Sequence, residues 1–211
     1  WDGKWQPNEL GSIWVVDDPA IRKSEQRKQV AKLLRSDFGS HTNSFLVYLL
    51  AHADQRIRLE AQFELARRDR FDEFLGLATN PNGDRLARVH AMWGLGQLDA
   101  DQQRDKRLAK RLPFADNDAE IRAQAAKLAG TRLLTSAAPR LMDLLHDKSA
   151  RVRFHAAMAL GQAGSPESTS NLIALLERNN DKDAYIRHAA IMGLTGSAEP
   201  EQLIVSSSHG S

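Results

Sequence analysis

One arginine recurs along the chain at a nearly constant interval, each time inside nearly the same short phrase. The five copies stand 30, 34, 31 and 34 residues apart. An aspartate precedes the arginine by four residues in four of the phrases, and Ser149 takes that place in the fourth phrase along the chain. A period of this length indicates that the chain repeats one structural unit and builds a row of small cores in place of one deep core. The arginines are Arg58, Arg88, Arg122, Arg153 and Arg187, and the aspartates are Asp54, Asp84, Asp118 and Asp183.

Each phrase predicts the start of a helix. Apolar residues spaced by four, such as Ile57, Ala61 and Leu65, form one face of a helix. The aspartate or serine is a good N-cap, because its side-chain oxygen accepts from amides that the first turn leaves unpaired. Leucine-rich segments lie between the phrases, and turn formers separate the two sets, so these segments predict a second set of helices. The leucine-rich segments are 46–50, 71–77, 108–112, 141–145 and 172–176.

The pattern predicts an all-α fold. We expect a solenoid of about five helical hairpins, with a short extended segment at its N-terminus. Residues 1–20 carry a Trp/Gly pattern and a short apolar run, and they predict a remnant strand or linker. Residues 21–204 are predicted to form the solenoid, with Pro200 opening a sixth unit. Residues 205–211 read as a disordered tail or a cloning remnant.

Composition and the absence of known motifs argue against several kinds of functional site. The chain has no cysteine, which excludes disulfides and thiolate metal sites, and its formal net charge is only +2. No apolar run is long enough to cross a membrane. None of the seven histidines stands three or four residues from another, and no hydrolase, metalloprotease or phosphate-loop motif occurs. We therefore expect no catalytic residue, metal or cofactor in this segment, and no enzymatic activity. A HEAT-type DNA glycosylase using Trp93 and Arg122 is the nearest enzymatic alternative, and the small net charge disfavours it.

Two clusters of basic residues leave open the alternative that the chain binds an anionic partner. Residues 22–35 carry a net charge of +5, and residues 104–111 carry +4. Both segments are predicted helices, and a solvated helix face is the commoner explanation of such a cluster. If the two clusters lined one groove, an anionic partner such as a nucleic acid or an acidic protein surface would follow. Nucleic acid is nevertheless not the expected partner.

The repeat assigns different roles to different positions. Because each arginine lies one helical turn after an aspartate, the pairs are predicted to form a charge-assisted ladder along the solenoid, with a structural role. Positions two and five after the arginine lie off the apolar stripe and carry Trp, Met and His, which suit a partner-binding face. The alternative is that Trp93, Met158 and Met192 complete the packing between helices. The predicted binding face comprises His90, Trp93, Gln97, His155, Met158, Gln162 and Met192.

Two stretches carry a family resemblance. Residues 149–161 and 183–190 resemble the second helix of a HEAT-like repeat, of the type also found in bilin-lyase-like proteins. This resemblance implies a right-handed α-α superhelix, that is, a HEAT- or armadillo-like solenoid. Residues 58–66 and 88–98, together with the Trp/Gly pattern near the start, resemble multidomain proteins of planctomycete-type bacteria. In those proteins a propeller dehydrogenase is followed by HEAT repeats and a cytochrome c domain. The chain departs from that family at Ser12 and Val15, where arginines are usual.

The resemblance implies a function for the segment. It would be a noncatalytic scaffold that spaces and orients a propeller-type dehydrogenase domain and a haem domain in a larger exported redox protein. Its partners would be neighbouring domains of the same polypeptide or another protein, and its location the periplasm. The alternative is a stand-alone HEAT-repeat binding module for protein or nucleic acid.

Overall fold

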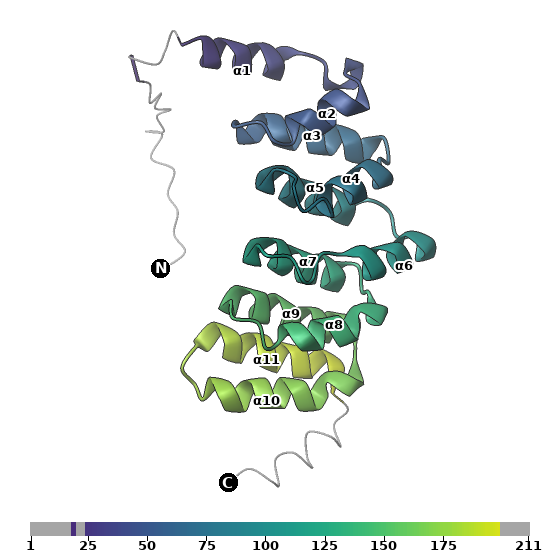
Figure 1. Ribbon diagram of the computed structural model, residues 1–211, viewed down its shortest axis with the longest axis vertical. Helices are drawn as coiled ribbons and strands as arrows, with labels where there is room; N and C mark the ends of the chain where they lie inside the picture. The colour runs from purple at the N-terminus through teal and green to yellow at the C-terminus, as the bar shows by residue number, and fades with distance from the viewer. Residues whose placement is uncertain (1–17, 20–23, 199–211) are drawn as a thin grey trace, which may run out of the picture. The chain divides into compact units, whose positions relative to one another are not determined.

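The computed structural model describes residues 18–19 and 24–198, and within these residues the regular structure is entirely helical (Figure 1). The chain divides into two compact units, Trp1–Ser36 and Asp37–Ser211. The described helix of the first unit is α1 (Glu25–Arg35), whose N-cap Ser24 accepts from the amide of Arg27. The hairpins all belong to the second unit.

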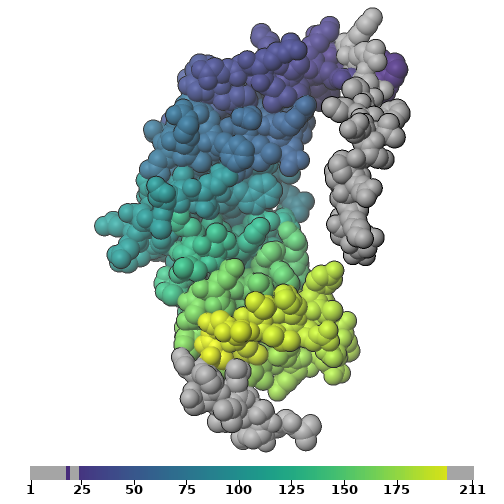
Figure 2. All heavy atoms as spheres, turned by 180° about the vertical axis from the view of Figure 1, so that it is seen from behind, coloured from purple at the N-terminus to yellow at the C-terminus, as the bar shows by residue number. Residues whose placement is uncertain are grey.

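Residues 37–198 form five helical hairpins. In each hairpin a first helix, or A helix, is followed by a second helix, or B helix, and each B helix packs on the B helix of the next hairpin (Figure 1). Figure 2 shows the same hairpins from behind as successive bands of colour. The A helices are α2 (Asn43–Leu49), α4 (Phe71–Ala78), α6 (Gln102–Arg111), α8 (Ala138–Leu144) and α10 (Thr169–Asn179). The B helices are α3 (Gln55–Arg67), α5 (Arg85–Gln97), α7 (Ala119–Thr131), α9 (Ala150–Ala163) and α11 (Ala184–Ser197).

This arrangement confirms the all-α, HEAT-like solenoid of five hairpins. Short 3₁₀ turns, η1 (Phe38–Ser40), η2 (Thr135–Ala137) and η3 (Pro166–Ser168), precede three of the A helices. The right hand of the superhelix stays an expectation. So do the domain boundaries, because the proposed strand within residues 1–17 and the sixth unit and tail within 199–211 lie outside the described residues.

The B helices begin where the caps predict. Asp54, Asp84, Asp118 and Asp183 each accept a hydrogen bond from an amide in the first turn of their own helix. Ser149 stands at the cap position of α9 but makes no such side-chain bond. Its own amide donates instead to Oδ1 of Asp147, at 2.8 Å.

Small residues let the B helices approach closely, as the central alanine of each stripe predicts. The alanines at that position, such as Ala125 and Ala156, are fully buried. Between α9 and α11 the contact is closer still, because a Cβ added at Gly161 would lie 2.8 Å from both Cα of Gly193 and the carbonyl oxygen of Met192. Glycine is required there because two helix backbones meet.

The arginine ladder exists, but its partners are not the capping aspartates. Arg88 pairs with Asp116 of the next hairpin, and Arg122 donates to both carboxylate oxygens of Asp147 in the hairpin after its own, at 2.7 and 2.9 Å. Arg187 pairs with Asp181. The aspartates at these three places stand two residues before the cap position. The expected pairing with Asp54, Asp84, Asp118 and Asp183 is therefore wrong.

The remaining ladder arginines bind backbone oxygens. Arg58 donates to the carbonyl oxygens of His52 and Ala53, and Arg153 donates to those of Asp147 and Lys148. The capping aspartates do not pair with the ladder arginines because of the direction in which a capping side chain points. A capping carboxylate turns toward the amides of its own first turn, whereas the loop just before the cap lies beside the arginine side chains. Asp54 and Asp118 pair instead with other arginines, Arg56 and Arg85.

Two arginines of the second basic cluster, residues 104–111, form contacts between hairpins. Arg104 and Arg107, on α6, pair with Asp69 and Asp72, and both guanidinium groups lie over the ring of Phe71. These arginines hold α6 against the preceding hairpin. Residues 22 and 23 of the first cluster lie outside the described residues.

Candidate partner-binding face

The position five residues after each ladder arginine forms an exposed row along the B helices. Phe63, Trp93 and Met192 are 49%, 38% and 44% exposed, and they hold the same repeat position in three B helices. Lys127 at this position is exposed and Met158 is half-buried. We call these five residues the outer row. Three of its members, Trp93, Met158 and Met192, belong to the predicted binding face.

The position two residues after each arginine is buried or half-buried in four of the five B helices, and only Glu60 on α3 is exposed there. His90 and Gln124 are buried there, and Ala189 is fully buried. His155 is half-buried. His90 therefore contributes to the interface between α3 and α5 and does not present its ring to a partner, contrary to its place in the predicted face.

His90 is held by three neighbours. Nε of Arg58 donates to its Nε2 at 3.0 Å, so Nδ1 carries the ring proton and donates to Oε1 of Gln62 at 2.7 Å. The ring also meets that of Trp93 edge to face, at 4.8 Å between centroids. Burial, and then the charge of Arg58, lower the pKa of His90 from 6.5 to about 4. The ring is neutral at physiological pH.

The buried ring predicts acid sensitivity. Between pH 6.5 and about 4 the unfolded chain takes up a proton at His90 and the folded chain does not. The free energy of unfolding should therefore fall with decreasing pH across this window, by up to about 3 kcal/mol. His90→Gln, which places here the residue that α7 has at Gln124, should flatten the slope measured by urea denaturation at several pH values. Burial also lowers the pKa of His155. His155 therefore still contributes to the pH dependence of stability in that variant. An unchanged slope would contradict the assignment.

A polar chain links three B helices beside the outer row. Nε1 of Trp93 donates to Oε1 of Gln124 at 2.9 Å, and Nε2 of Gln124 donates to Oε1 of Glu120 at 2.7 Å. Arg151 then donates to both oxygens of Glu120. Burial raises the pKa of Glu120, but these hydrogen bonds outweigh it and lower the pKa below its usual value. The indole of Trp93 is thereby held in one orientation although the side chain is partly exposed.

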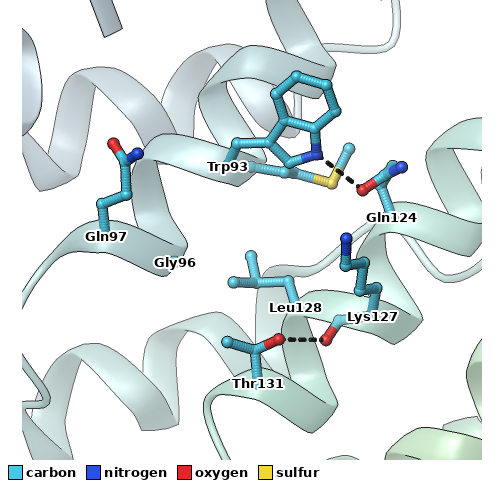
Figure 3. Close-up of a pocket in the computed structure, with 8 residues that line it drawn as sticks. Trp93, Gly96, Gln97, Gln124, Lys127, Leu128 and Thr131 are labelled. Carbon is cyan, nitrogen blue, oxygen red and sulfur yellow. Dashed lines mark hydrogen bonds between the residues drawn. The ribbon is translucent and has the colours of Figure 1, made fainter. Parts of the chain in front are cut away.

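A pocket of about 200 Å³ lies between α5 and α7, beside Trp93 (Figure 3). It brings together two predicted residues, Trp93 and Gln97, which both come from α5. Lys127 extends from α7 toward the side of the pocket that Trp93 occupies (Figure 3). The lining comprises Met92, Trp93, Gly96, Gln97, Gln124, Lys127, Leu128 and Thr131.

The other predicted residues lie further along the stack, outside this pocket. His155, Met158 and Gln162 are on α9, and Met192 is on α11. Gln162 is exposed but reaches back to the close approach of α7 and α9, because a Cβ at Gly130 would collide with its Oε1. The predicted face is thus a strip across α5, α9 and α11 with one pocket at its α5 end.

Sequence reasoning missed the charged partners of this strip. Glu120 and Arg151 stand two residues before their ladder arginines in successive hairpins, and they pair across the interface between α7 and α9. Opposite charges at the same repeat position in neighbouring units were the available signal. Arg68 and Arg132 were missed as well. Each follows the end of a B helix and donates to backbone carbonyls of an earlier loop, at Gly39 and Leu98 for example.

No group of three or more His, Asp or Glu side chains in residues 18–19 and 24–198 is arranged to hold a metal ion. In the same part of the chain, no helix has the length and apolar character needed to cross a membrane.

The hairpins and their stacked B helices define the class as a HEAT-like helical solenoid. A protein-family model described as HEAT repeats matches residues 106–195. No curated protein matches the chain. Among solved structures, the chain is similar to one in the complex of CpcE and CpcF of phycocyanin lyase from Nostoc sp. PCC7120. The two chains are 19% identical with a TM-score of 0.55, and the match covers 81% of this chain and 71% of the other. At this identity the likeness shows a shared fold.

The comparison corrects one expectation. The absence of catalytic motifs and the repeat architecture led us to expect that the segment is not an enzyme. A chain of the same fold belongs to a lyase, so this expectation is not upheld. The physical reason is that a solenoid can place side chains from several helices on one surface, without any short motif in the sequence.

Proposed function

We propose that the chain is an interaction scaffold whose outer row binds a protein partner. The observation that carries the proposal is the exposure of Phe63, Trp93 and Met192 at equivalent positions of α3, α5 and α11. Large apolar and aromatic side chains with a fixed orientation are the usual anchors of protein interfaces. The HEAT-repeat match supports an interaction role.

The proposed partners are neighbouring domains of a larger exported redox protein. On this proposal the solenoid spaces and orients a propeller-type dehydrogenase domain and a haem domain, the cofactor belongs to those domains, and the location is the periplasm. The resemblance of residues 58–66 and 88–98 to such multidomain proteins supports it. A stand-alone protein-binding module is the alternative.

One face of α11 supports contact with a further helical element. The residue four places after the ladder arginine is buried in the earlier B helices, at Gln62, Met92, Ala126 and Ala157. Gln62 bonds to His90 of the following hairpin, so this position belongs to the interface between hairpins. Its equivalent in α11, Ile191, is 49% exposed. The position that forms the interface between hairpins in the earlier B helices is therefore exposed on α11, at Ile191.

The test is calorimetry of the chain with separately purified propeller and haem domains. These domains would come from the longer protein that the proposal assigns to this chain. Trp93→Ala combined with Met158→Ala should weaken binding at least tenfold, because interface anchors typically contribute about 2 kcal/mol or more. The melting temperature should change by only a few degrees, because both side chains are partly exposed.

Tyr48→Ala is the matched control. Tyr48 is an exposed aromatic residue on α2, an A helix away from the outer row, so its removal should leave binding unchanged. Equal binding by the parent and the double variant, or no binding of either domain, would refute the proposal. A large loss of stability in the double variant would instead assign Trp93 and Met158 to the core.

A further inference from the structure

The pocket between α5 and α7 is lined by side chains that other contacts within the protein hold in place. Met92 and Leu128 are buried and present apolar surface, and Trp93 forms a third wall (Figure 3). The indole cannot turn freely, because its N–H is already committed to Gln124 at 2.9 Å. Gln124 is in turn held by Glu120. An aromatic surface that is already oriented loses little conformational entropy when a ligand binds.

The pocket has one formal charge on its lining, and that charge is positive. Lys127 is the only ionisable side chain among the described residues that line it. Within the described part of the chain its ammonium forms no ion pair with a carboxylate. The positive charge also reaches His155, whose pKa is lowered by burial and then by Arg151 and Lys127. A ligand carboxylate would therefore not have to displace an ion-pair partner of Lys127. Glu120, which accepts from the pocket-lining Gln124, is itself paired with Arg151.

The volume limits the size of the ligand. Drug-sized ligands occupy pockets of roughly 300–1,000 Å³, whereas an apolar cavity of roughly 150 Å³ holds benzene. About 200 Å³ therefore accommodates one aromatic ring with a short substituent.

We propose that this pocket binds a small aromatic carboxylate. The ring packs against Trp93 and Leu128, and the carboxylate pairs with Lys127 in a charge-assisted hydrogen bond. The pocket shares Trp93 and Lys127 with the outer row, but small-ligand binding is a different role from protein binding, and its test needs no protein partner.

The probe is 3-phenylpropionate, titrated into ¹⁵N-labelled protein. The indole N–H signal of Trp93, identified by its loss in Trp93→Phe, should shift in a saturable way. The neutral 3-phenylpropionamide should bind about tenfold more weakly, because it lacks the charge that Lys127 recognises. Lys127→Met keeps the apolar stem and should cause a similar loss for the acid. Lys110→Met removes an exposed lysine from α6, away from the pocket, and should bind as the parent does.

A second variant narrows the pocket without disturbing the fold. A Cβ at Gly96 would meet only Leu128, at the ordinary contact distance of 3.5 Å, so Gly96→Ala should fold normally. Alanine also favours the helix. This variant should bind 3-phenylpropionate at least tenfold more weakly with an equal or higher melting temperature. The proposal is overturned if the parent shows no shift up to about 10 mM acid, which corresponds to a negligible affinity. It is also overturned if Lys127→Met and Gly96→Ala both bind as well as the parent.

Discussion

Arg122→Ala is expected to lower the free energy of unfolding by about 2–4 kcal/mol, because it leaves a buried carboxylate without its cation. Arg122 and Asp147 are only 17% and 8% exposed, and the pair joins two successive hairpins. The hydrogen bonds from Arg122 lower the pKa of Asp147 below 3.8. The stability contributed by that shift is present above pH 3.8 and is lost as the pH falls through the folded-state pKa. The difference between variant and parent, measured by urea denaturation, should therefore shrink below this pH.

Arg187→Ala is the matched control, because Arg187 holds the same repeat position in α11. Its pair with Asp181 is 47% and 73% exposed. Surface pairs of this kind contribute less than about 1 kcal/mol, so this variant should unfold almost as the parent does. Equal destabilisation by both substitutions would show that the arginine acts through something other than the buried ion pair.

Gly161→Ala is expected to destabilise the chain by about 1–3 kcal/mol, although alanine favours a helix. The added methyl group would lie 2.8 Å from backbone atoms of Met192 and Gly193, and backbone cannot move aside as a flexible side chain can. The helices α9 and α11 must then separate. Because each hairpin contacts only its neighbours, the loss should concentrate in the last one. Hydrogen exchange should report faster opening of α10 and α11 than of α3 and α5.

Gly76→Ala provides the opposite case in an A helix. Apart from the nearby backbone of its own helix, no heavy atom of the described residues lies within 4 Å of a Cβ added at Gly76, so only the helix preference of alanine remains. This variant should be more stable than the parent by about 1 kcal/mol. If Gly161→Ala were also stabilising, the close approach of α9 and α11 would not matter to stability.

Helix positions were predictable because the interactions that set them are local. The caps Asp54 and Asp183 act on amides two or three residues away, so a short phrase is enough to place α3 and α11. The spacing of the apolar stripe similarly depends only on the helical period. Leucine-rich segments placed the A helices within a few residues of their observed starts, except for α6, which begins at Gln102 in a polar stretch.

The candidate face was harder to predict because the position of a residue on a helix does not show how deeply its side chain is buried. Positions two and five after the arginine are both off the apolar stripe, yet His90 is buried and Trp93 is partly exposed. The difference depends on the neighbouring hairpin. Arg58 and Gln62 of α3 cover His90, whereas the indole N–H of Trp93 donates to Gln124 of α7.

The sequence by itself determined the repeat, the two sets of helices and most of the caps, since each depends on residues within a few positions of one another. The tertiary structure decided which residues each ladder arginine binds and which candidate side chains reach the surface. Asp147 lies 25 residues from Arg122, and Gln124 lies 31 residues from Trp93. Such contacts depend on how one hairpin is rotated against the next. That rotation results from packing along the whole B-helix interface, so it cannot be predicted from a short sequence segment.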